Sequence, residues 1–165
     1  MLKKKRLATL ILFVLIGVNG AAHATEIKSN AVALLYHHVS NDTPKITSVR
    51  PEAFEQQLDY IEKNNFNVWP LEKIILYINN NQTLPDKTIA ISFDDAYQSV
   101  YTEAYPRLKA RNMPFTIFVT TESVDQQYNQ QLDWAALKIM QQHGATLANH
   151  TATHPHMLYR LQDET

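Results

Sequence analysis

Residues 88–95 read Thr-Ile-Ala-Ile-Ser-Phe-Asp-Asp, an apolar run that ends in two adjacent carboxylates. The run has the length and the composition of a buried strand. Later in the chain, residues 150–154 read His-Thr-Ala-Thr-His. Two imidazoles and one carboxylate make a divalent-metal site with open coordination positions, and the second carboxylate is then free to move protons. The two motifs together predict a metal-assisted hydrolase that activates water.

Apolar runs and segments of helical period alternate along the rest of the chain. Pro51 suits the first position of a helix, and apolar residues follow it at helical spacing. Within a helical segment at residues 99–111, Pro106 must either kink the helix or begin its second half. Asp133 is expected to cap the last helix and Gly144 to close it. We predict a further helix at residues 71–78, a loop at 40–50, and strands at 31–36 (buried), 67–69, 89–93, 115–119 and 145–148.

This alternation of strands and helices predicts an α/β fold with a parallel sheet and right-handed crossovers. In such folds the chemistry gathers at the carboxyl ends of the strands. Asp94 and Asp95 end one predicted strand, and His150 follows another. We therefore expect two segments that are distant in sequence to meet at one edge of the sheet.

The first 24 residues are predicted to be a signal peptide. Four basic residues at positions 3–6 precede an apolar run at 7–18, and Ala22-His23-Ala24 offers the small residues of a cleavage site. The mature domain, residues 25–165, should then be exported, to the periplasm of a Gram-negative cell or outside the cell. The absence of cysteine excludes a lipid-anchored start, a disulfide and a thiolate zinc site.

The charge of the predicted mature chain argues against two classes of partner. Without residues 1–24, 11 basic residues remain against 16 acidic ones, a net charge of −5 with neutral histidine. A mildly acidic chain without a basic stripe does not suit nucleic acid or anionic membranes. No apolar run after Thr25 approaches 18 residues, so we expect no stable membrane insertion after signal cleavage.

Each motif alone has a simpler explanation. An Asp pair at a strand end is commonly a helix cap in a solvated loop. Seven histidines in 165 residues give some pair four apart by chance about once in four sequences. Histidines four apart can nevertheless face the same way and grip one ion. Because both motifs follow predicted strands, the metal site is the better interpretation of the two together.

Four segments resemble the polysaccharide deacetylases, carbohydrate esterase family four, also called the NodB-homology domain. They are Ser-Phe-Asp-Asp at 92–95, Pro-Arg-Leu-Lys at 106–109, Met-Pro-Phe-Thr-Ile-Phe-Val at 113–119 and Ala-Asn-His-Thr-Ala-Thr-His-Pro-His-Met at 148–157. The opening Leu-Tyr-His-His-Val at 35–39 also looks like the family's first strand. The resemblance covers roughly residues 32–158 and is strongest to the exported poly-N-acetylglucosamine and chitin-type branch.

The resemblance implies a deformed (β/α) barrel that removes N-acetyl groups from an aminosugar polysaccharide. Carried over by position, Asp94 would be the general base. Asp95, His150 and His154 would bind the metal, with zinc the usual ion. The metal would polarise the acetamide carbonyl while Asp94 takes a proton from the bound water. The amine must leave protonated, and in the family that acid is a histidine in a late Leu-x-His motif, for which this chain has no counterpart.

The chain departs from the family pattern in two ways. Ala96 stands where the family usually has glycine, and its methyl group would strain the turn if that position needs a positive φ. The chain is also short for a full barrel, and the family's Arg-x-Pro-Tyr, late Asp-Trp and Leu-x-His segments have no counterparts. We therefore expect a domain that is truncated at its C-terminus.

These departures leave a second function open, a catalytically incomplete remnant that binds metal or glycan. A glycosidase, which needs two separated carboxylates, fits poorly. Among other residues, His37 could line the site, whereas His38 is expected in a loop and His156 at the surface. A tyrosine stripe at positions 97, 101 and 105 could stack on sugar, but a helix packing face explains it better.

Overall fold

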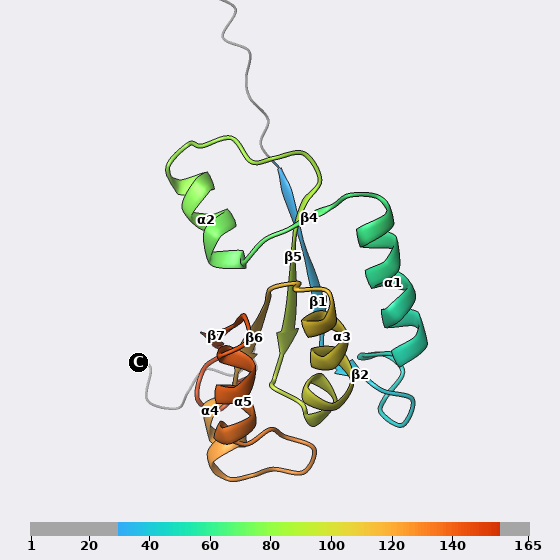
Figure 1. The fold of residues 1–165 in the computed structure, drawn as a ribbon. Helices are drawn as coiled ribbons and strands as arrows, with labels where there is room; N and C mark the ends of the chain where they lie inside the picture. Colours follow the sequence, from blue (N-terminus) through green and yellow to red (C-terminus); the bar gives the residue numbers. More distant parts are fainter. Residues whose placement is uncertain (1–29, 156–165) are drawn as a thin grey trace, which may run out of the picture.

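The computed structural model describes residues 30–155, so the predicted signal peptide and His156 lie outside the described residues. Parallel strands alternate with helices along the chain (Figure 1). The elements are β1 (Ala31–Tyr36), β2 (His38–Val39), β3 (Ser48–Val49), α1 (Pro51–Lys63), β4 (Asn67–Val68), α2 (Leu71–Asn79), β5 (Thr88–Asp94), the π-helical segment η1 (Val100–Ala104), α3 (Tyr105–Ala110), β6 (Phe115–Val119), α4 (Thr121–Asp125), α5 (Trp134–Gln141) and β7 (Ala145–Asn149).

The main sheet is parallel throughout and has the order β1-β5-β6-β7. β1 pairs with β5 along its whole length, from Ala31 opposite Thr88 to Tyr36 opposite Phe93. On the other side of β5, β4 pairs with its first residues and β6 with its last. β5 is therefore the central strand, and all six of its residues from Thr88 to Phe93 are buried, as the apolar run predicts.

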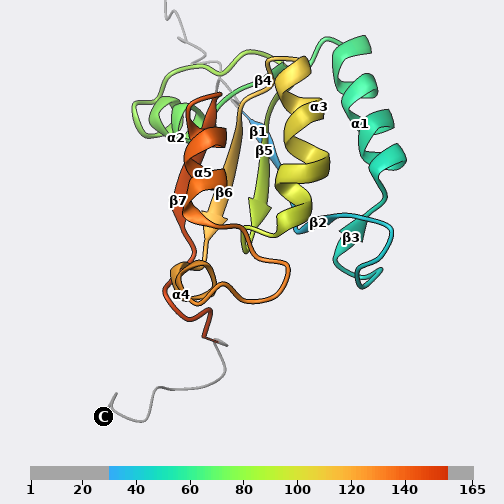
Figure 2. The same ribbon diagram turned by 60° about the horizontal axis from the view of Figure 1, so that its bottom comes forward.

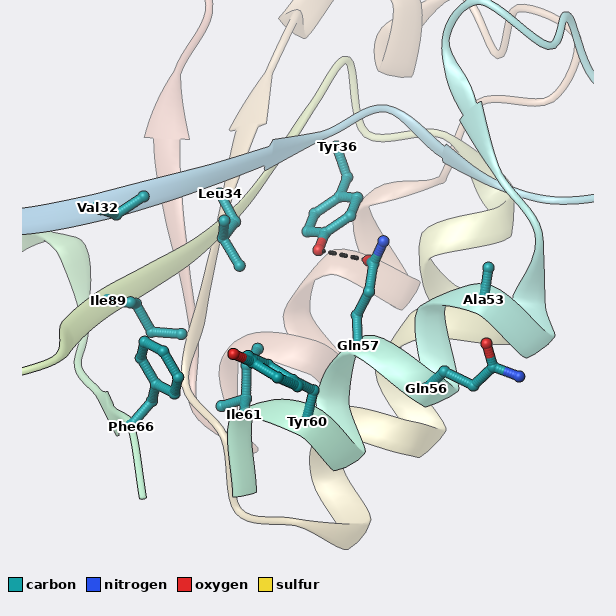
Figure 3. Close-up of a pocket in the computed structure, with 10 residues that line it drawn as sticks. All are labelled: Val32, Leu34, Tyr36, Ala53, Gln56, Gln57, Tyr60, Ile61, Phe66 and Ile89. Carbon is teal, nitrogen blue, oxygen red and sulfur yellow. Dashed lines mark hydrogen bonds between the residues drawn. The ribbon is translucent and has the colours of Figure 1, made fainter. Parts of the chain in front are cut away.

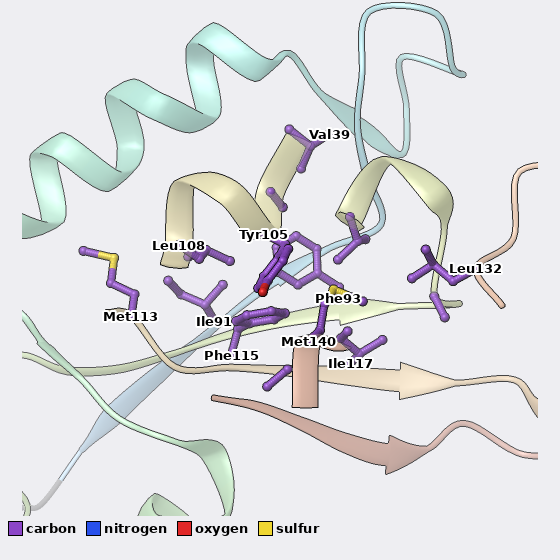
Figure 4. Close-up of a cluster of buried hydrophobic side chains, with 14 of the residues drawn as sticks. Val39, Ile91, Phe93, Tyr105, Leu108, Met113, Phe115, Ile117, Leu132 and Met140 are labelled. Carbon is purple, nitrogen blue, oxygen red and sulfur yellow. The ribbon is translucent and has the colours of Figure 1, made fainter. Parts of the chain in front are cut away.

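Helices α1, α3 and α5 cover one face of the sheet, and α2 lies on the other side (Figures 1 and 2). The alternation of side chains along β5 explains this division, because successive residues point to opposite faces. Ile91 and Phe93 belong to the core beneath α1, α3 and α5, whereas Ala90 packs with Ile74 of α2. Figure 4 shows the larger core, in which Phe93 and Phe115 meet edge to face with ring centroids 5.9 Å apart.

The predicted strands are confirmed, but the prediction that β1 is buried is wrong. Val32 and Leu35 are 56% and 55% exposed. Periodicity cannot distinguish a central strand from an edge strand, and within residues 30–155 β1 has a strand neighbour on one side only. An open hollow of about 550 Å³ lies between β1 and α1 (Figure 3), and none of the four predicted site residues lines it.

Several finer predictions are settled by the structure. Pro106 begins the second half of its helical segment, since α3 starts at Tyr105 after the π-helical turn of η1. Asp133 caps α5 by accepting a hydrogen bond from the Ala136 N–H at 2.7 Å. Gly144 follows that helix with a φ of 98°, which suits glycine. Helix α4 and the two-residue strands β2 and β3 were not predicted, and β3 lies within residues 40–50, where a loop is expected. Among the described residues, no helix is both long and apolar enough to cross a membrane.

An ion-pair cluster ties α3 to α1 and generates a first prediction. Arg111 lies against three carboxylates of α1, those of Glu55, Asp59 and Glu62, and its side chain is largely shielded from solvent. We expect Arg111→Ala to lower the free energy of unfolding by about 1–2 kcal/mol, because Asp59 and Glu62 lose their cationic partner and Glu55 keeps only Arg107.

Urea denaturation at low and at high salt checks this prediction. The loss should shrink in about 1 M salt, where charges are screened within roughly 3 Å. Arg50→Ala is the matched control, because the Arg50 side chain is exposed and forms no capping hydrogen bond to α1. A loss that is equal for the two variants would contradict the role of the cluster.

Candidate metal centre

The sheet brings both predicted motifs to one edge. Asp94 is the last residue of β5, and it pairs with Phe118 of β6. β6 in turn pairs with β7 up to Val119 opposite Asn149, and the His150 N–H donates to the Val119 carbonyl at 3.0 Å. Because the strands are parallel, their carboxyl ends are adjacent. The expectation that residues 94–95 and 150–154 meet is confirmed.

Asp95, His150 and His154 converge on one point. Asp95 Oδ1 lies 3.5 Å from His150 Nε2 and 3.6 Å from His154 Nε2. One possible ligand atom from each residue lies within 4.8 Å of the other two. The Asp95 side chain is 15% exposed and that of His154 is 50% exposed, so the group opens to solvent on the histidine side.

These separations fit a shared cation better than direct hydrogen bonds. Nitrogen–oxygen hydrogen bonds are about 2.7–3.2 Å long, shorter than either separation. Two ligands that each lie about 2.0–2.2 Å from a tetrahedral zinc ion are about 3.3–3.6 Å apart. The two nitrogens and one oxygen are also ligand types that zinc accepts. Asp95, His150 and His154 therefore fit a divalent-metal site with room for further ligands.

Asp94 lies beside this group but occupies a different environment. Its Oδ2 is 3.9 Å from His150 Nε2. Burial raises the pKa of Asp94 above its ordinary value, while the charges of His150 and His37 act in the opposite direction. A carboxylate with a raised pKa binds a proton more readily, so Asp94 suits a proton acceptor next to the three possible ligands.

The turn that carries Asp95 has an unusual backbone. Asp95 and Ala96 both adopt left-handed conformations, with φ of 67° and 55°. The position where the family usually has glycine therefore does take a positive φ in this chain, and the Ala96 methyl group is buried in the core. Leu132 N–H donates to the Ala96 carbonyl at 2.9 Å, and Tyr97 forms a β-bridge with Gln131. The segment before α5 thus holds this turn from one side.

The loop that carries the histidines is irregular rather than helical. Thr151 and His154 have φ of 68° and 50°, and the His154 N–H donates to Thr151 Oγ1 at 3.0 Å. The first residues of α4 donate to this loop, from Thr121 N–H to the Thr151 carbonyl at 3.3 Å and from Glu122 N–H to the Ala152 carbonyl at 3.0 Å. His150 and His154 lie together because the chain turns between them, and not because they share one face of a helix.

The burial of His38 was not predicted from the sequence. The expectation that it is a loop residue is wrong, because His38 lies in β2 and is buried. Its ring stacks on Tyr97 with centroids 3.7 Å apart and an interplanar angle of 28°. Tyr101 and Tyr105 stack on each other and pack with the core, so the packing interpretation holds for them, whereas the Tyr97 ring stacks on His38. A polar residue at a strand end can be buried or exposed, and the sequence pattern does not distinguish the two.

Comparison with known proteins supports the resemblance drawn from the motifs. A family model described as polysaccharide deacetylase matches residues 81–165. Poly-β-1,6-N-acetyl-D-glucosamine N-deacetylase from Staphylococcus aureus is 28% identical over 148 residues, which cover 81% of this chain and 51% of that protein. This chain therefore spans about half of the length of that curated relative.

Two solved structures resemble this one closely. The Streptococcus pyogenes deacetylase PplD, in complex with acetate, has a TM-score of 0.69 and 28% identity, over 76% of this chain and 57% of that one. IcaB from Ammonifex degensii has a TM-score of 0.68 and 29% identity, over 75% of this chain and 54% of that one. The predicted fold class, an α/β fold of the deacetylase type, is confirmed.

The left-handed conformation of Ala96 generates a second prediction. Ala96→Gly should change the free energy of unfolding by less than about 1 kcal/mol, because relief of the strained φ offsets the lost methyl burial and the freer unfolded chain. Ala96→Val should cost more than about 2 kcal/mol, because a β-branched side chain then occupies a buried left-handed position. Thermal and urea unfolding measure both. Equal stability of the valine and glycine variants would contradict the strain.

Proposed function

The chain belongs to the polysaccharide deacetylase family, and on that basis we propose that it hydrolyses the N-acetyl groups of an aminosugar polysaccharide. The convergence of Asp95, His150 and His154, with Asp94 beside them, is the observation that carries this proposal. The relative from Staphylococcus aureus, named for poly-β-1,6-N-acetyl-D-glucosamine, supports a polymer of N-acetylglucosamine as the substrate. Because the match covers only 51% of that relative, the complete reaction is part of this proposal.

We propose that Asp95, His150 and His154 hold a divalent cation, most simply zinc. The donor set and the separations of 3.5 and 3.6 Å from Asp95 Oδ1 support this assignment. When bound, such a cation supplies Lewis acidity, which lowers the pKa of water and stabilises negative charge on an acetamide oxygen.

Asp94 acts as the general base in this proposal. It accepts a proton from the water that attacks the acetamide carbonyl carbon, and the carbon–nitrogen bond then breaks to release acetate and leave a free amine. The raised pKa of Asp94 makes its carboxylate a stronger base, and its place next to His150 keeps it within reach of the attacking water. The departing nitrogen must also gain a proton, and we assign no residue within 30–155 to that step.

We further propose that the protein is exported to the periplasm or the cell exterior. The basic residues at positions 3–6 and the apolar run at 7–18 support a signal peptide that ends at Ala24. A substrate that is a polymer of the envelope or of the cell exterior is consistent with this location.

The separate roles of the two carboxylates generate a third prediction. Asp94→Asn should lower acetate release from acetylated glucosamine oligomers by about 100- to 10,000-fold while zinc binding persists, because only the proton acceptor is lost. Asp95→Asn and His150→Ala should lose both zinc and activity. Asp86→Asn is the matched control, since Asp86 is exposed and belongs to the loop before β5.

Three results are informative here. Zinc binding without acetate release in the unaltered protein would favour the metal-binding remnant over the enzyme. Full activity of Asp94→Asn would exclude Asp94 as the base. Unchanged zinc binding in both Asp95→Asn and His150→Ala would refute the metal site itself.

Removal of the metal generates a fourth prediction. Dialysis against a strong chelator should reduce acetate release at least 100-fold, and added zinc should restore it. Circular dichroism should show that the fold persists, because strand pairing and a core of apolar side chains, which includes none of the proposed metal ligands, hold the sheet together. Activity that survives exhaustive chelation would contradict metal dependence.

A further inference from the structure

We propose that a polar surface beside the metal centre binds the sugar units that flank the one at the cation, and that it favours sugars without acidic groups. This inference rests on the proposed function, since it adds a binding surface for the same polymer to the same site. Two hollows carry it. The Ser40 hollow, of about 390 Å³, is lined by Ser40 and Thr102 among others, and the Tyr128 hollow, of about 410 Å³, by Tyr128 and Asn129 among others. Both volumes lie in the range of small-molecule sites.

The two hollows adjoin each other, because Gln98 and Gln130 line both of them. The Gln98 N–H donates to the Gln130 carbonyl at 2.6 Å. The shared wall is therefore a bonded backbone contact between the residues before η1 and the loop at 126–133. Adjoining hollows of this size can hold neighbouring sugar units of one chain.

Both hollows border the turn that carries Asp95. Leu132 lines the Tyr128 hollow, and its N–H donates to the Ala96 carbonyl at 2.9 Å. On the other side, His38 lines the Ser40 hollow, and its ring stacks on Tyr97 with centroids 3.7 Å apart. Ala96 and Tyr97 are the two residues that follow Asp95 in the chain. The walls of both hollows thus contact the residues next to a proposed metal ligand.

The separation from the cation is short enough for one oligomer. Gln98 follows Asp95 by three residues, and three residues of chain span at most about 11 Å. A few linked sugar units cover that length. An oligomer with one unit at the cation can therefore place the next units in the hollows.

The loop at 126–133 has a defined shape. It follows α4 at the carboxyl end of the strands (Figure 2). The Tyr128 N–H donates to the Ser123 carbonyl, and the Gln131 N–H donates to the Tyr128 carbonyl, both at 3.0 Å. These bonds involve only the backbone of Tyr128, whose residue is 53% exposed. Replacement of the Tyr128 side chain should therefore leave the loop in place.

The side chains of the two hollows suit the hydroxyl groups of sugars. Every residue that lines the Ser40 hollow is polar, and three further amides, those of Gln127, Asn129 and Gln131, line the Tyr128 hollow. Amide and hydroxyl side chains both donate and accept hydrogen bonds, as sugar hydroxyls do. The exposed Tyr128 ring adds an apolar face on which the C–H groups of a sugar ring can pack.

Charge restricts which sugars fit. Asp42 lines the Ser40 hollow and Asp133 lines the Tyr128 hollow, whereas no lysine or arginine among residues 30–155 lines either one. A uronic acid in these hollows would place its carboxylate near another carboxylate without a compensating cation. N-acetylglucosamine is uncharged and meets no such repulsion.

The main test compares oligomers of different length. Tyr128→Ala should raise the KM for the hexamer of N-acetylglucosamine roughly five- to tenfold, the usual effect of losing one aromatic contact, and the KM for the dimer by a smaller factor. Gln98→Ala should act in the same direction, because its side chain lines both hollows. In both variants kcat should change less than KM, because neither residue belongs to the metal centre. Rates of acetate release measure these constants.

Two exposed residues of α1 provide the matched controls. Tyr60 and Gln56 line the separate hollow between α1 and β1, and both are exposed. Tyr60→Ala and Gln56→Ala should leave the hexamer KM unchanged. Thermal unfolding checks that all four variants are folded.

A binding measurement without the metal separates this inference from catalysis. Calorimetric titration of the chelator-treated protein with the hexamer should show binding that Tyr128→Ala weakens, because none of the three proposed metal ligands lines either hollow. A hexamer that alternates N-acetylglucosamine with glucuronic acid should bind about tenfold more weakly than the neutral hexamer, because its carboxylates meet those of the hollows.

The outcomes distinguish this inference from the proposed function. If the parent releases acetate, and Tyr128→Ala and Gln98→Ala match it on both oligomers, the flanking surface is wrong and the deacetylase stands. A parent that binds the hexamer through Tyr128 but releases no acetate supports the surface and removes the enzyme. Equal binding of the neutral and the acidic hexamer would overturn the selection by charge.

Discussion

Parallel pairing of β5, β6 and β7 determines where the ligand side chains can lie. The pairs Asp94–Phe118 and Val119–Asn149 place the ends of β5 and β7 one strand apart at the same edge. A slip of one residue in β7 would move His150 by about 3.3 Å and turn its side chain to the other face. The register of these three strands, which their buried apolar side chains specify, therefore decides whether Asp95 and the two histidines can meet.

Both ligand segments adopt costly backbone conformations at this edge, and neighbouring segments stabilise them. Positive φ occurs at Asp95 and Ala96 on one side, and at Thr151 and His154 on the other. Such conformations persist where several contacts from the surrounding structure hold the backbone in place. The Leu132 N–H and the first amides of α4 provide those hydrogen bonds. Backbone hydrogen bonds of the protein therefore fix the two segments that carry Asp95, His150 and His154.

The sequence was sufficient to predict the main strands of the sheet and the meeting of the two motifs, but not which strand lies at an exposed edge. The apolar run at 88–95 and the motif at 150–154 predicted a buried strand and the meeting of Asp95 with both histidines, because parallel strands share a carboxyl edge. The exposure of β1 could not be predicted, since apolar content does not reveal how many neighbours a strand has. The burial of His38 also escaped prediction, because it depends on packing against a residue far away in the chain.

The hydrogen bonds from α4 to the histidine loop have a consequence for local stability. A helix of five residues, Thr121–Asp125, has little intrinsic stability, and its first amides are the ones that bind the carbonyls of Thr151 and Ala152. Fraying of this short helix and release of the loop are therefore one cooperative event. The sheet can stay folded while the loop that carries His150 and His154 opens. The rate of amide hydrogen exchange in α4 therefore measures how often this loop opens.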